Sequence, residues 1–140
     1  MKPEEVRNPT PEQMTVALLE TAHAGRWNHW QHELREHAGD WVTVSEMRKP
    51  MKAEQFARLP EAVAKYRFVE LCVYSYKRRT VWGYYCRKLP FENHTLSGVL
   101  VVYDPLADEI FHCMRPQKGK RYCKRWGEQE RFFVGVRWHK

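Results

Sequence analysis

The chain lacks the features that mark membrane and secreted proteins. No apolar run approaches the roughly 18 residues that cross a bilayer. Residues 1–10 are rich in proline and charge and contain no apolar core like that of a signal peptide. We therefore expect a soluble, cytoplasmic protein without a membrane partner.

The sequence also lacks the short motifs of common enzymes and metal sites. It contains no GxSxG, HExxH or P-loop motif and no glycine-rich dinucleotide fingerprint. The four cysteines, Cys72, Cys86, Cys113 and Cys123, are 14, 27 and 10 residues apart, so no CxxC pair is available for a zinc knuckle. We predict four reduced thiols, no bound metal and no cofactor.

What the chain has is positive charge and aromatic side chains, concentrated in its second half. Residues 1–65 contain nine Lys and Arg and ten Asp and Glu, whereas residues 66–140 contain fifteen and seven. Fifteen aromatic residues also fall in the second half, against four in the first. A length of 140 residues suffices for one domain with a sizeable core. We predict a single domain over 1–140, with residues 1–10 as a mobile N-terminal arm.

The first half has helical spacing. Thr10-Pro11-Glu12-Gln13 has the residues of a capping box, and Gly25 can end the helix that follows. The spacing of Trp27, Trp30 and Leu34 predicts a second helix from about Trp27 to His37, ended by Gly39, which forms a hairpin with the first.

A third helix is predicted from Lys52, after a short β-like run over residues 41–44. Its apolar spacing continues to Tyr66, but Pro60 lacks a backbone donor and disfavours helical geometry at Leu59. We therefore expect this helix to be broken or kinked near Leu59.

From Tyr66 the apolar period changes from 3.6 to 2, which predicts strands. Residues 66–77 and 80–88 flank Lys77-Arg78-Arg79 and read as a hairpin with a basic tip. Further strands are expected over 98–103, 110–114, 121–126 and 131–138. The predicted fold is α+β, with a helical hairpin and a broken third helix packed on an antiparallel sheet of five or six strands. This order is similar to that of barnase-like and RelE-like ribonucleases and of nuclear-transport-factor-like pocket proteins, so it does not select a function.

The densest functional signal is a basic segment over residues 115–126. It has six cations in eleven residues, with two aromatic residues interleaved. Cations bind phosphates through counterion release, and aromatic rings stack on unpaired bases. We predict a non-catalytic nucleic-acid-binding module whose partner is nucleic acid or a nucleoprotein. Its predicted binding residues are Lys77, Arg78, Arg79, Arg115, Lys118, Lys120, Arg121, Tyr122, Lys124, Arg125 and Trp126.

Two other functions fit the same residues. A small metal-independent ribonuclease needs a general base, a general acid and cations, for which His94 and His112 are the candidates. A protein-binding inhibitor or adaptor, such as mobile elements encode, would use the basic surface to meet an acidic protein. Binding titrations that also monitor cleavage distinguish the three functions.

The second predicted helix also contains three histidines, His29, His32 and His37, with Glu33 and Glu36. At about 100° per residue, His32 and His37 lie to opposite sides of the face that His29 and Glu33 share. Three ligands cannot converge from that arc without a partner from elsewhere in the chain. The sequence therefore predicts a polar, partly exposed helix face here.

Overall fold

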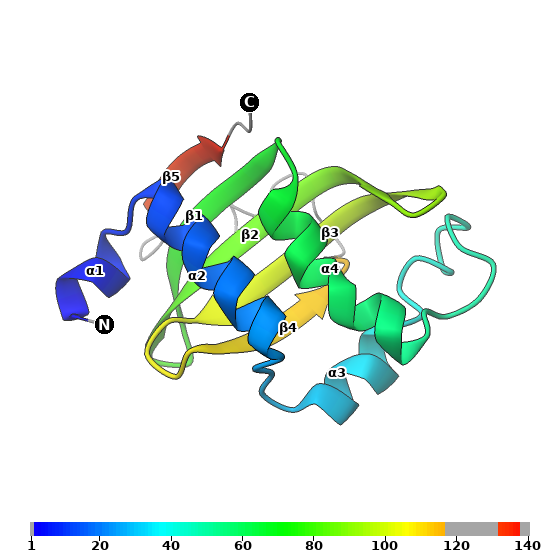
Figure 1. The fold of residues 1–140 in the computed structure, drawn as a ribbon, viewed down its shortest axis with the longest axis horizontal. Helices are drawn as coiled ribbons and strands as arrows, with labels where there is room; N and C mark the ends of the chain where they lie inside the picture. Colours follow the sequence, from blue (N-terminus) through cyan, green and yellow to red (C-terminus); the bar gives the residue numbers. More distant parts are fainter. Residues whose placement is uncertain (1, 117–131, 138–140) are drawn as a thin grey trace.

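The computed structural model describes residues 2–116 and 132–137 and has an α+β fold (Figure 1). Its helices are α1 (Pro3–Arg7), α2 (Pro11–Ala24), α3 (Trp30–His37) and α4 (Ala53–Lys65). Its strands are β1 (Val69–Tyr76), β2 (Arg79–Phe91), β3 (His94–Asp104), β4 (Glu109–Met114) and β5 (Phe132–Arg137). The strands form one sheet in the order β4-β3-β2-β1-β5, and every neighbouring pair is antiparallel. The predicted class is therefore confirmed.

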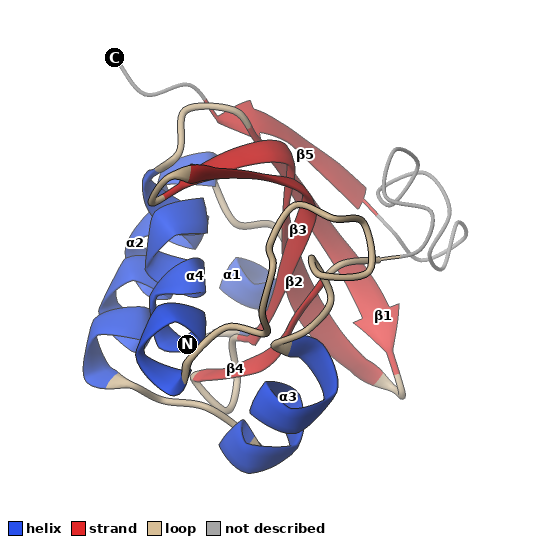
Figure 2. Cartoon of the chain, turned by 90° about the vertical axis from the view of Figure 1, so that its right-hand side faces the viewer, coloured by secondary structure: helices blue, strands red, loops and turns tan. Residues whose placement is uncertain are grey.

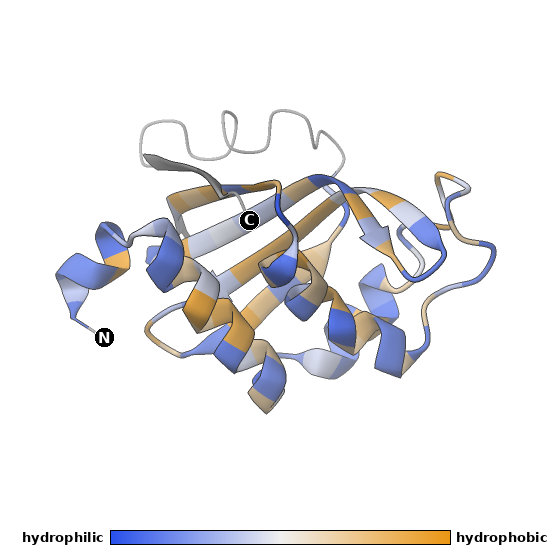
Figure 3. Ribbon diagram, turned by 45° about the horizontal axis from the view of Figure 1, so that its top comes forward, coloured by the Kyte–Doolittle hydropathy of each residue, from blue (hydrophilic) through white to orange (hydrophobic). Residues whose placement is uncertain are grey.

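The helices lie on one face of the sheet. Figure 2 shows α2 and α4 side by side over the curved strands, with α3 beside β4 at the sheet edge. Figure 3 shows apolar residues on the central strands beneath these helices. The core between the layers includes Met14 and Leu18 of α2 and Phe56, Leu59 and Val63 of α4, all with no exposed surface.

Two aromatic side chains of β2 hold the N-terminal helices on the sheet. Trp82 donates its indole N–H to the carbonyl of Val6 at 2.7 Å, and Tyr84 donates its hydroxyl to the carbonyl of Met14 at 2.7 Å. Both rings are buried, so each hydrogen bond satisfies a polar group that water cannot reach. Residues 3–7 thus form a helix whose Val6 is buried.

The opposite face of the sheet has a second, smaller cluster of apolar side chains. Its buried members are Cys72, Tyr74, Val81, Tyr85, Leu100 and Val102, and Phe111 and Met114 pack against them. Residues on alternate positions of each strand supply the two faces, as the pleat of a β-strand requires. The sheet is therefore apolar on both sides, which explains the nearly continuous apolar run of β3.

Several local predictions are confirmed. Helix α2 begins with the expected capping box, in which Thr10 accepts from the Gln13 amide while the Gln13 side chain accepts from the Thr10 amide. It ends at Gly25, whose φ of 67° is left-handed. Strands β1 and β2 form the expected hairpin around Lys77 and Arg78.

The expected helical hairpin is wrong, because α2 packs against α4 and α3 packs against β4. Helix α3 begins at Trp30, since Trp27 forms a parallel β-bridge with Ile110 and the N-cap residue, His29, is left-handed. Gly39 does not end it in a left-handed conformation, and the cap residue is Ala38 in a right-handed one. Residues 41–44 form turns, so the expected β-like run is also wrong.

The expected break at Leu59 is wrong as well, because α4 runs continuously through Pro60. An internal proline costs a helix about 3 kcal/mol. Burying Phe56, Leu59 and Val63 stabilises the helix by about 1.5 to 3 kcal/mol for each side chain, which exceeds that cost. The tertiary packing of one helix face thus overrides the local preference.

The outer edge of β4 is covered by residues 26–40. The Ile110 amide donates to the Arg26 carbonyl at 2.8 Å, and the Asn28 amide donates to the Ile110 carbonyl at 2.9 Å. Further along, the amides of Cys113 and Arg115 donate to side-chain carboxylates, as described below. An uncovered strand edge would expose backbone groups that pair with other chains, and this segment prevents that.

Trp30 and Leu34 should stabilise the fold, since both pack against the core from α3. The Trp30 ring lies 4.8 Å from the Trp27 ring and 5.8 Å from the Phe56 ring, centroid to centroid. We expect Trp30→Ala and Leu34→Ala each to lower the free energy of unfolding by about 2 to 5 kcal/mol in denaturant titrations. Leu106→Ala, at a side chain that is 65% exposed, is the control and should change little.

Asp108 links the β3–β4 turn to the end of α2, and acid should remove the stability that this link provides. Its carboxylate accepts from the Thr21 hydroxyl at 2.6 Å and the Tyr103 hydroxyl at 2.7 Å, and it pairs with Arg26. Burial opposes ionisation, but the hydrogen bonds from Thr21 and Tyr103 and the Arg26 charge leave the pKa of Asp108 below its usual 3.8. The stabilisation is therefore complete above pH 3.8 and is lost as the pH falls through the lowered pKa.

Asp108→Asn should test this link without straining the backbone, because asparagine tolerates the φ of 56° at this position. We expect the variant to lose about 1 to 2 kcal/mol of unfolding free energy at pH 7 and to be less acid-sensitive than the parent below pH 4. Unfolding curves measured from pH 2 to 7 check both effects. Parallel pH profiles for the two proteins would contradict the assignment.

Candidate functional site

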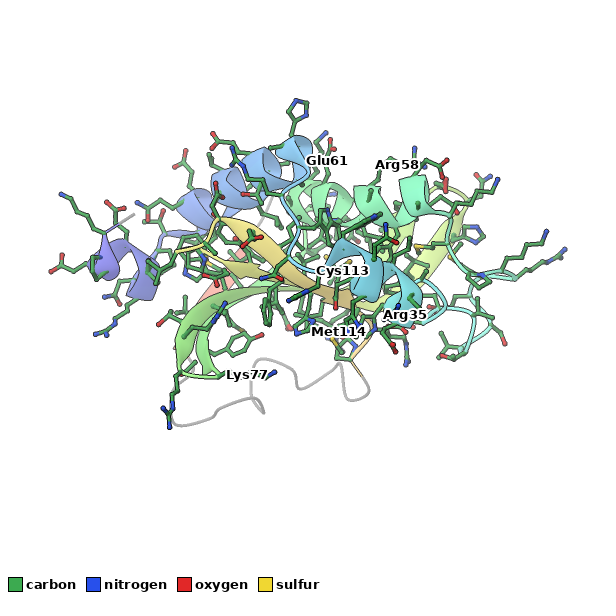
Figure 4. All side chains as sticks on the ribbon, turned by 90° about the horizontal axis from the view of Figure 1, so that it is seen from below. Arg35, Arg58, Glu61, Lys77, Cys113 and Met114 are labelled. Atoms are coloured by element: carbon green, nitrogen blue, oxygen red, sulfur yellow. The ribbon has the colours of Figure 1, made fainter. Side chains whose placement is uncertain are left out.

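The tip of the β1–β2 hairpin presents two exposed cations on a strained backbone. Lys77 and Arg78 have φ values of 48° and 68°, so both adopt the left-handed conformation of a two-residue hairpin turn. Asparagine and glycine fit such a turn, whereas other residues pay about 1 to 2 kcal/mol each. Figure 4 shows Lys77 on the side of the sheet away from Arg58 and Glu61 of α4.

The next residue, Arg79, makes contacts within the protein. Its guanidinium donates to the buried carboxylate of Asp104 at 2.6 Å and lies over the Phe111 ring at 5.6 Å from the centroid. All three predicted cations of the tip are exposed, and Arg79 also joins the start of β2 to Asp104 at the end of β3.

A second group of cations lies at the opposite end of β2; we call Arg67, Phe68, Arg87, Lys88 and Arg115 the basic end. Glu70 pairs with Tyr85 in the β1–β2 ladder, and continuing this register past the start of β1 places Phe68 level with Arg87. Phe68 is 41% exposed, and the Arg67 guanidinium lies 5.3 Å from its ring centroid. The basic end thus combines exposed positive charge with an accessible aromatic ring.

Gly98 lies between Tyr85 and Arg115 at the basic end. Its φ of 72° is left-handed, and a Cβ here would lie 3.3 Å from the Tyr85 hydroxyl and 3.6 Å from Cγ of Arg115. Burial raises the pKa of Tyr85 to about 12, helped by the charge of Glu70 and opposed by those of Arg87 and Arg115. Among the described residues, Nε of Arg115 is buried and has no hydrogen-bond partner.

The other residues of the predicted basic segment cannot be placed. They lie outside the described residues and are Lys118, Lys120, Arg121, Tyr122, Lys124, Arg125 and Trp126.

The tip and the basic end are separated by eight residues of β2, about 27 Å at about 3.4 Å per residue. The described cations therefore form two groups.

A buried carboxylate organises a separate polar cluster between α3 and β4. Oε1 of Glu33 accepts from the Cys113 amide at 3.0 Å, and Nδ1 of His112 lies 3.2 Å from Oε2. Nε2 of His37, one turn along α3, lies 4.0 Å from the same Oε2. Glu33 is 1% exposed, so these partners supply the polar contacts that a buried carboxylate needs.

Asp40 extends this cluster towards the basic end. Its Oδ2 lies 3.0 Å from Nδ1 of His37 and accepts from the Arg115 amide at 3.0 Å. The hydrogen bond to Asp40 raises the pKa of His37 above its usual 6.5, although burial opposes this. Glu33 and Asp40 thus hold both the edge of β4 and the orientation of His37.

The two candidate ribonuclease histidines lie in different places. His94 begins β3 and its Nδ1 lies 3.2 Å from the Glu46 carbonyl, whereas His112 contacts Glu33. His112 pairs with Val102, eight residues along β3 from His94. At about 3.4 Å per residue this separates them by about 27 Å of strand, so the two imidazoles do not face one phosphate.

The described cysteines offer no activated nucleophile. Cys86 and Cys113 are free and buried, and burial raises the pKa of Cys113, with the charges of Glu33 and Asp40 adding to the effect. A thiol in such surroundings stays protonated and unreactive. Cys72 is disulfide-bonded, so the prediction of four reduced thiols is wrong. Cys123 lies outside the described residues.

One open pocket lies on the helical side, over α1, α2 and β2. Its volume is about 370 Å³, and its lining includes Glu5, Glu12 and Glu20 as well as Trp82. Three carboxylates disfavour a phosphate, so this pocket does not suit a nucleic acid.

None of the helices described here has the length and apolar character of a membrane-spanning segment.

Comparisons with protein-family models, with curated proteins and with solved structures found no match to this chain. The candidate sites are therefore interpreted from their own geometry and chemistry.

The sequence analysis named Glu33, His37 and His112 but did not bring them together. Helical spacing places His37 to one side of the face that holds Glu33, and His112 is only a candidate ribonuclease histidine in the sequence. Between Glu33 and His112 lie 78 residues of sequence, and no spacing rule connects them. Likewise, the exposed Phe68 becomes a candidate only once the strand register places it beside Arg87.

A thiol titration tests the assignment of the cysteines. With Cys72 in a disulfide and Cys86 and Cys113 free, we expect fewer than four titratable thiols in the denatured, unreduced chain and four after reduction. Because disulfides are uncommon in the reducing cytoplasm, the same count bears on the expected location. Four thiols before reduction, in protein purified without reductant, would contradict the disulfide.

Proposed function

We propose that this protein binds single-stranded nucleic acid through the two cationic groups at opposite ends of the sheet. The observation that carries the proposal is the hairpin tip, where two consecutive exposed cations occupy left-handed positions. Strained backbone conformations persist mainly where function requires the residue. Asparagine and glycine would satisfy the fold better than Lys77 and Arg78, so the cations at this turn are best explained by a contact with an anionic partner.

The basic end supplies the second contact. In the described part of the chain, Arg78, Arg87 and Lys88 form no ion pair. Phe68 provides an exposed ring on which an unpaired base can stack, a contact worth about 1 to 3 kcal/mol. The span of about 27 Å along β2 suits several nucleotides of an extended strand. Contacts are confined to the two ends, because Tyr74, Tyr85 and Leu100 between them are buried.

This surface favours binding without catalysis. The imidazoles of His94 and His112 do not face a common point, and the described free thiols are buried. The remaining alternative, an inhibitor or adaptor that meets an acidic protein, would use the same cations but gain nothing from a base-stacking ring. The exposed Phe68 among arginines favours the nucleic acid.

The test is a polarisation titration against single-stranded RNA, single-stranded DNA and duplex DNA at several salt concentrations. The double variant Lys77→Asn with Arg78→Gly relieves the strained turn, so we expect its unfolding free energy to rise by about 1 to 2 kcal/mol. Its single-strand affinity should fall, and the slope of log affinity against log salt should flatten by about 1.4 to 1.8, which corresponds to two lost phosphate contacts. Weaker binding by a more stable protein cannot be attributed to unfolding.

Two further variants complete the design. Phe68→Ala should weaken single-strand binding without changing the salt slope, since it removes stacking and no charge. Arg48→Gln with Lys49→Gln removes the same charge from an exposed loop before α4 and should leave binding nearly unchanged. The proposed surface would be refuted if the Arg48 and Lys49 control flattened the salt slope equally, or if the Lys77 and Arg78 variant bound like the parent. RNA cleavage in EDTA that His94→Ala or His112→Ala abolishes would establish the ribonuclease alternative instead.

A further inference from the structure

The cluster between α3 and β4 brings two imidazoles and a carboxylate to one point. One ligand atom from each of Glu33, His37 and His112 lies within 4.8 Å of the other two. The three side chains come from two elements that meet only in the folded chain. In Figure 4, Cys113, the neighbour of His112 on β4, lies close to α3, where Arg35 is labelled. His112 of β4 is thus the third ligand residue that α3 by itself lacks.

The hydrogen bonds around the cluster fix which atoms face its centre. Asp40 can only accept a hydrogen bond, so Nδ1 of His37 has to donate to it. Nε2 of a neutral His37 then directs its lone pair towards Oε2 of Glu33, 4.0 Å away. Oε1 of Glu33 accepts the Cys113 amide, and Oε2 lies 3.2 Å from Nδ1 of His112, so ring nitrogens of both histidines approach Oε2. Two lone pairs that face each other repel unless a proton or a metal ion lies between them.

The distances suit a metal ion in that position. Zinc binds imidazole nitrogen and carboxylate oxygen at about 2.0 to 2.2 Å, so tetrahedral ligand atoms lie about 3.3 to 3.5 Å apart. Oε2 of Glu33 is 3.2 Å from Nδ1 of His112 and 4.0 Å from Nε2 of His37. These two values lie on either side of the tetrahedral spacing, and the ligand atoms of the two imidazoles lie within 4.8 Å of each other, so coordination would draw the two histidines together around the ion.

The surroundings have the arrangement of a built metal site. Metal-binding histidines commonly donate their other ring N–H to a carboxylate, as His37 does to Asp40. Asp40 is itself held by the Arg115 amide, so the orientation of His37 is fixed from behind. The side chains of His37 and His112 are 20% and 27% exposed, whereas that of Glu33 is 2% exposed. An ion could enter from solvent and would be anchored on the buried carboxylate.

We propose that Glu33, His37 and His112 bind one divalent transition-metal ion, with Asp40 as the positioning residue for His37. Two imidazoles and one carboxylate suit Zn²⁺, Co²⁺ or Fe²⁺ rather than Mg²⁺ or Ca²⁺. Three protein ligands leave a coordination position open to solvent. None of the three ligands belongs to the hairpin tip or the basic end, although the cluster adjoins the basic end where Asp40 accepts the Arg115 amide.

The experiment uses the untagged full chain, freed of metal with a chelator and dialysed against Zn²⁺ or Co²⁺. We expect one ion per chain, a higher melting temperature with Zn²⁺, and Co²⁺ absorption bands of nitrogen and oxygen coordination without thiolate charge transfer. His37→Ala with His112→Ala should weaken binding at least 100-fold while the apo protein stays folded, since both side chains are partly exposed. Asp40→Asn should weaken it about 10- to 100-fold.

The matched control replaces two histidines of the same region that lie outside the cluster. His29→Asn with His32→Asn should bind metal like the parent, and asparagine tolerates the left-handed φ of 57° at position 29. No stoichiometric binding by the folded parent would overturn the proposal and leave a hydrogen-bond network with a proton on His37. Unchanged binding by the His37 and His112 double variant, or cobalt–thiolate absorption, would also overturn it by placing the metal elsewhere.

Discussion

The covered edge of β4 is the constraint on which the rest of the architecture depends. A sheet that is apolar on both faces cannot leave the backbone of an outer strand exposed without inviting further strands to pair with it. Residues 26–40 solve this with backbone bonds at Ile110 and with the carboxylates of Glu33 and Asp40 at the amides of Cys113 and Arg115. The position of α3, and with it the whole polar cluster, follows from this requirement.

A bulge in the ladder decides which amides need covering. Tyr103 pairs with Ile110 but Val102 pairs with His112, so Phe111 is an extra residue in β4. Before the bulge, the amides that point away from β3 belong to even-numbered residues of β4, and after it they belong to odd-numbered residues. The edge amides that form hydrogen bonds are therefore those of Ile110, Cys113 and Arg115. The same shift places His112 at the edge beside Glu33. The inserted residue Phe111 thus turns the Cys113 amide towards the sheet edge, where the Glu33 carboxylate accepts it, and it also places His112 next to Glu33.

The two proposals use different ligand residues and different physics. At the hairpin tip and the basic end, cations are exposed and would act through phosphate charge, so salt should weaken them. In the cluster of Glu33, His37 and His112, the carboxylate is buried and the contacts are directional, so geometry dominates over long-range charge. The acidic pocket over Trp82 takes part in neither.

The sequence by itself determined the elements whose cause is local. The capping box at Thr10, the left-handed Gly25, the basic two-residue turn and the change of apolar period at Tyr66 all lie within a few residues of the structure they produce. Only the tertiary structure decided which elements and side chains contact one another. Pro60 should have broken α4, but burial of the helix face outweighs the missing hydrogen bond.

Helix α3 shows the same limit most clearly. Its start depends on a β-bridge from Trp27 to Ile110, and its partner is β4 instead of α2. The meeting of Glu33 with His112, and of Phe68 with Arg87, depends on strand register and on which edge a helix covers. The spacing of residues along the chain contains neither, because both are set by the packing energy of the complete sheet.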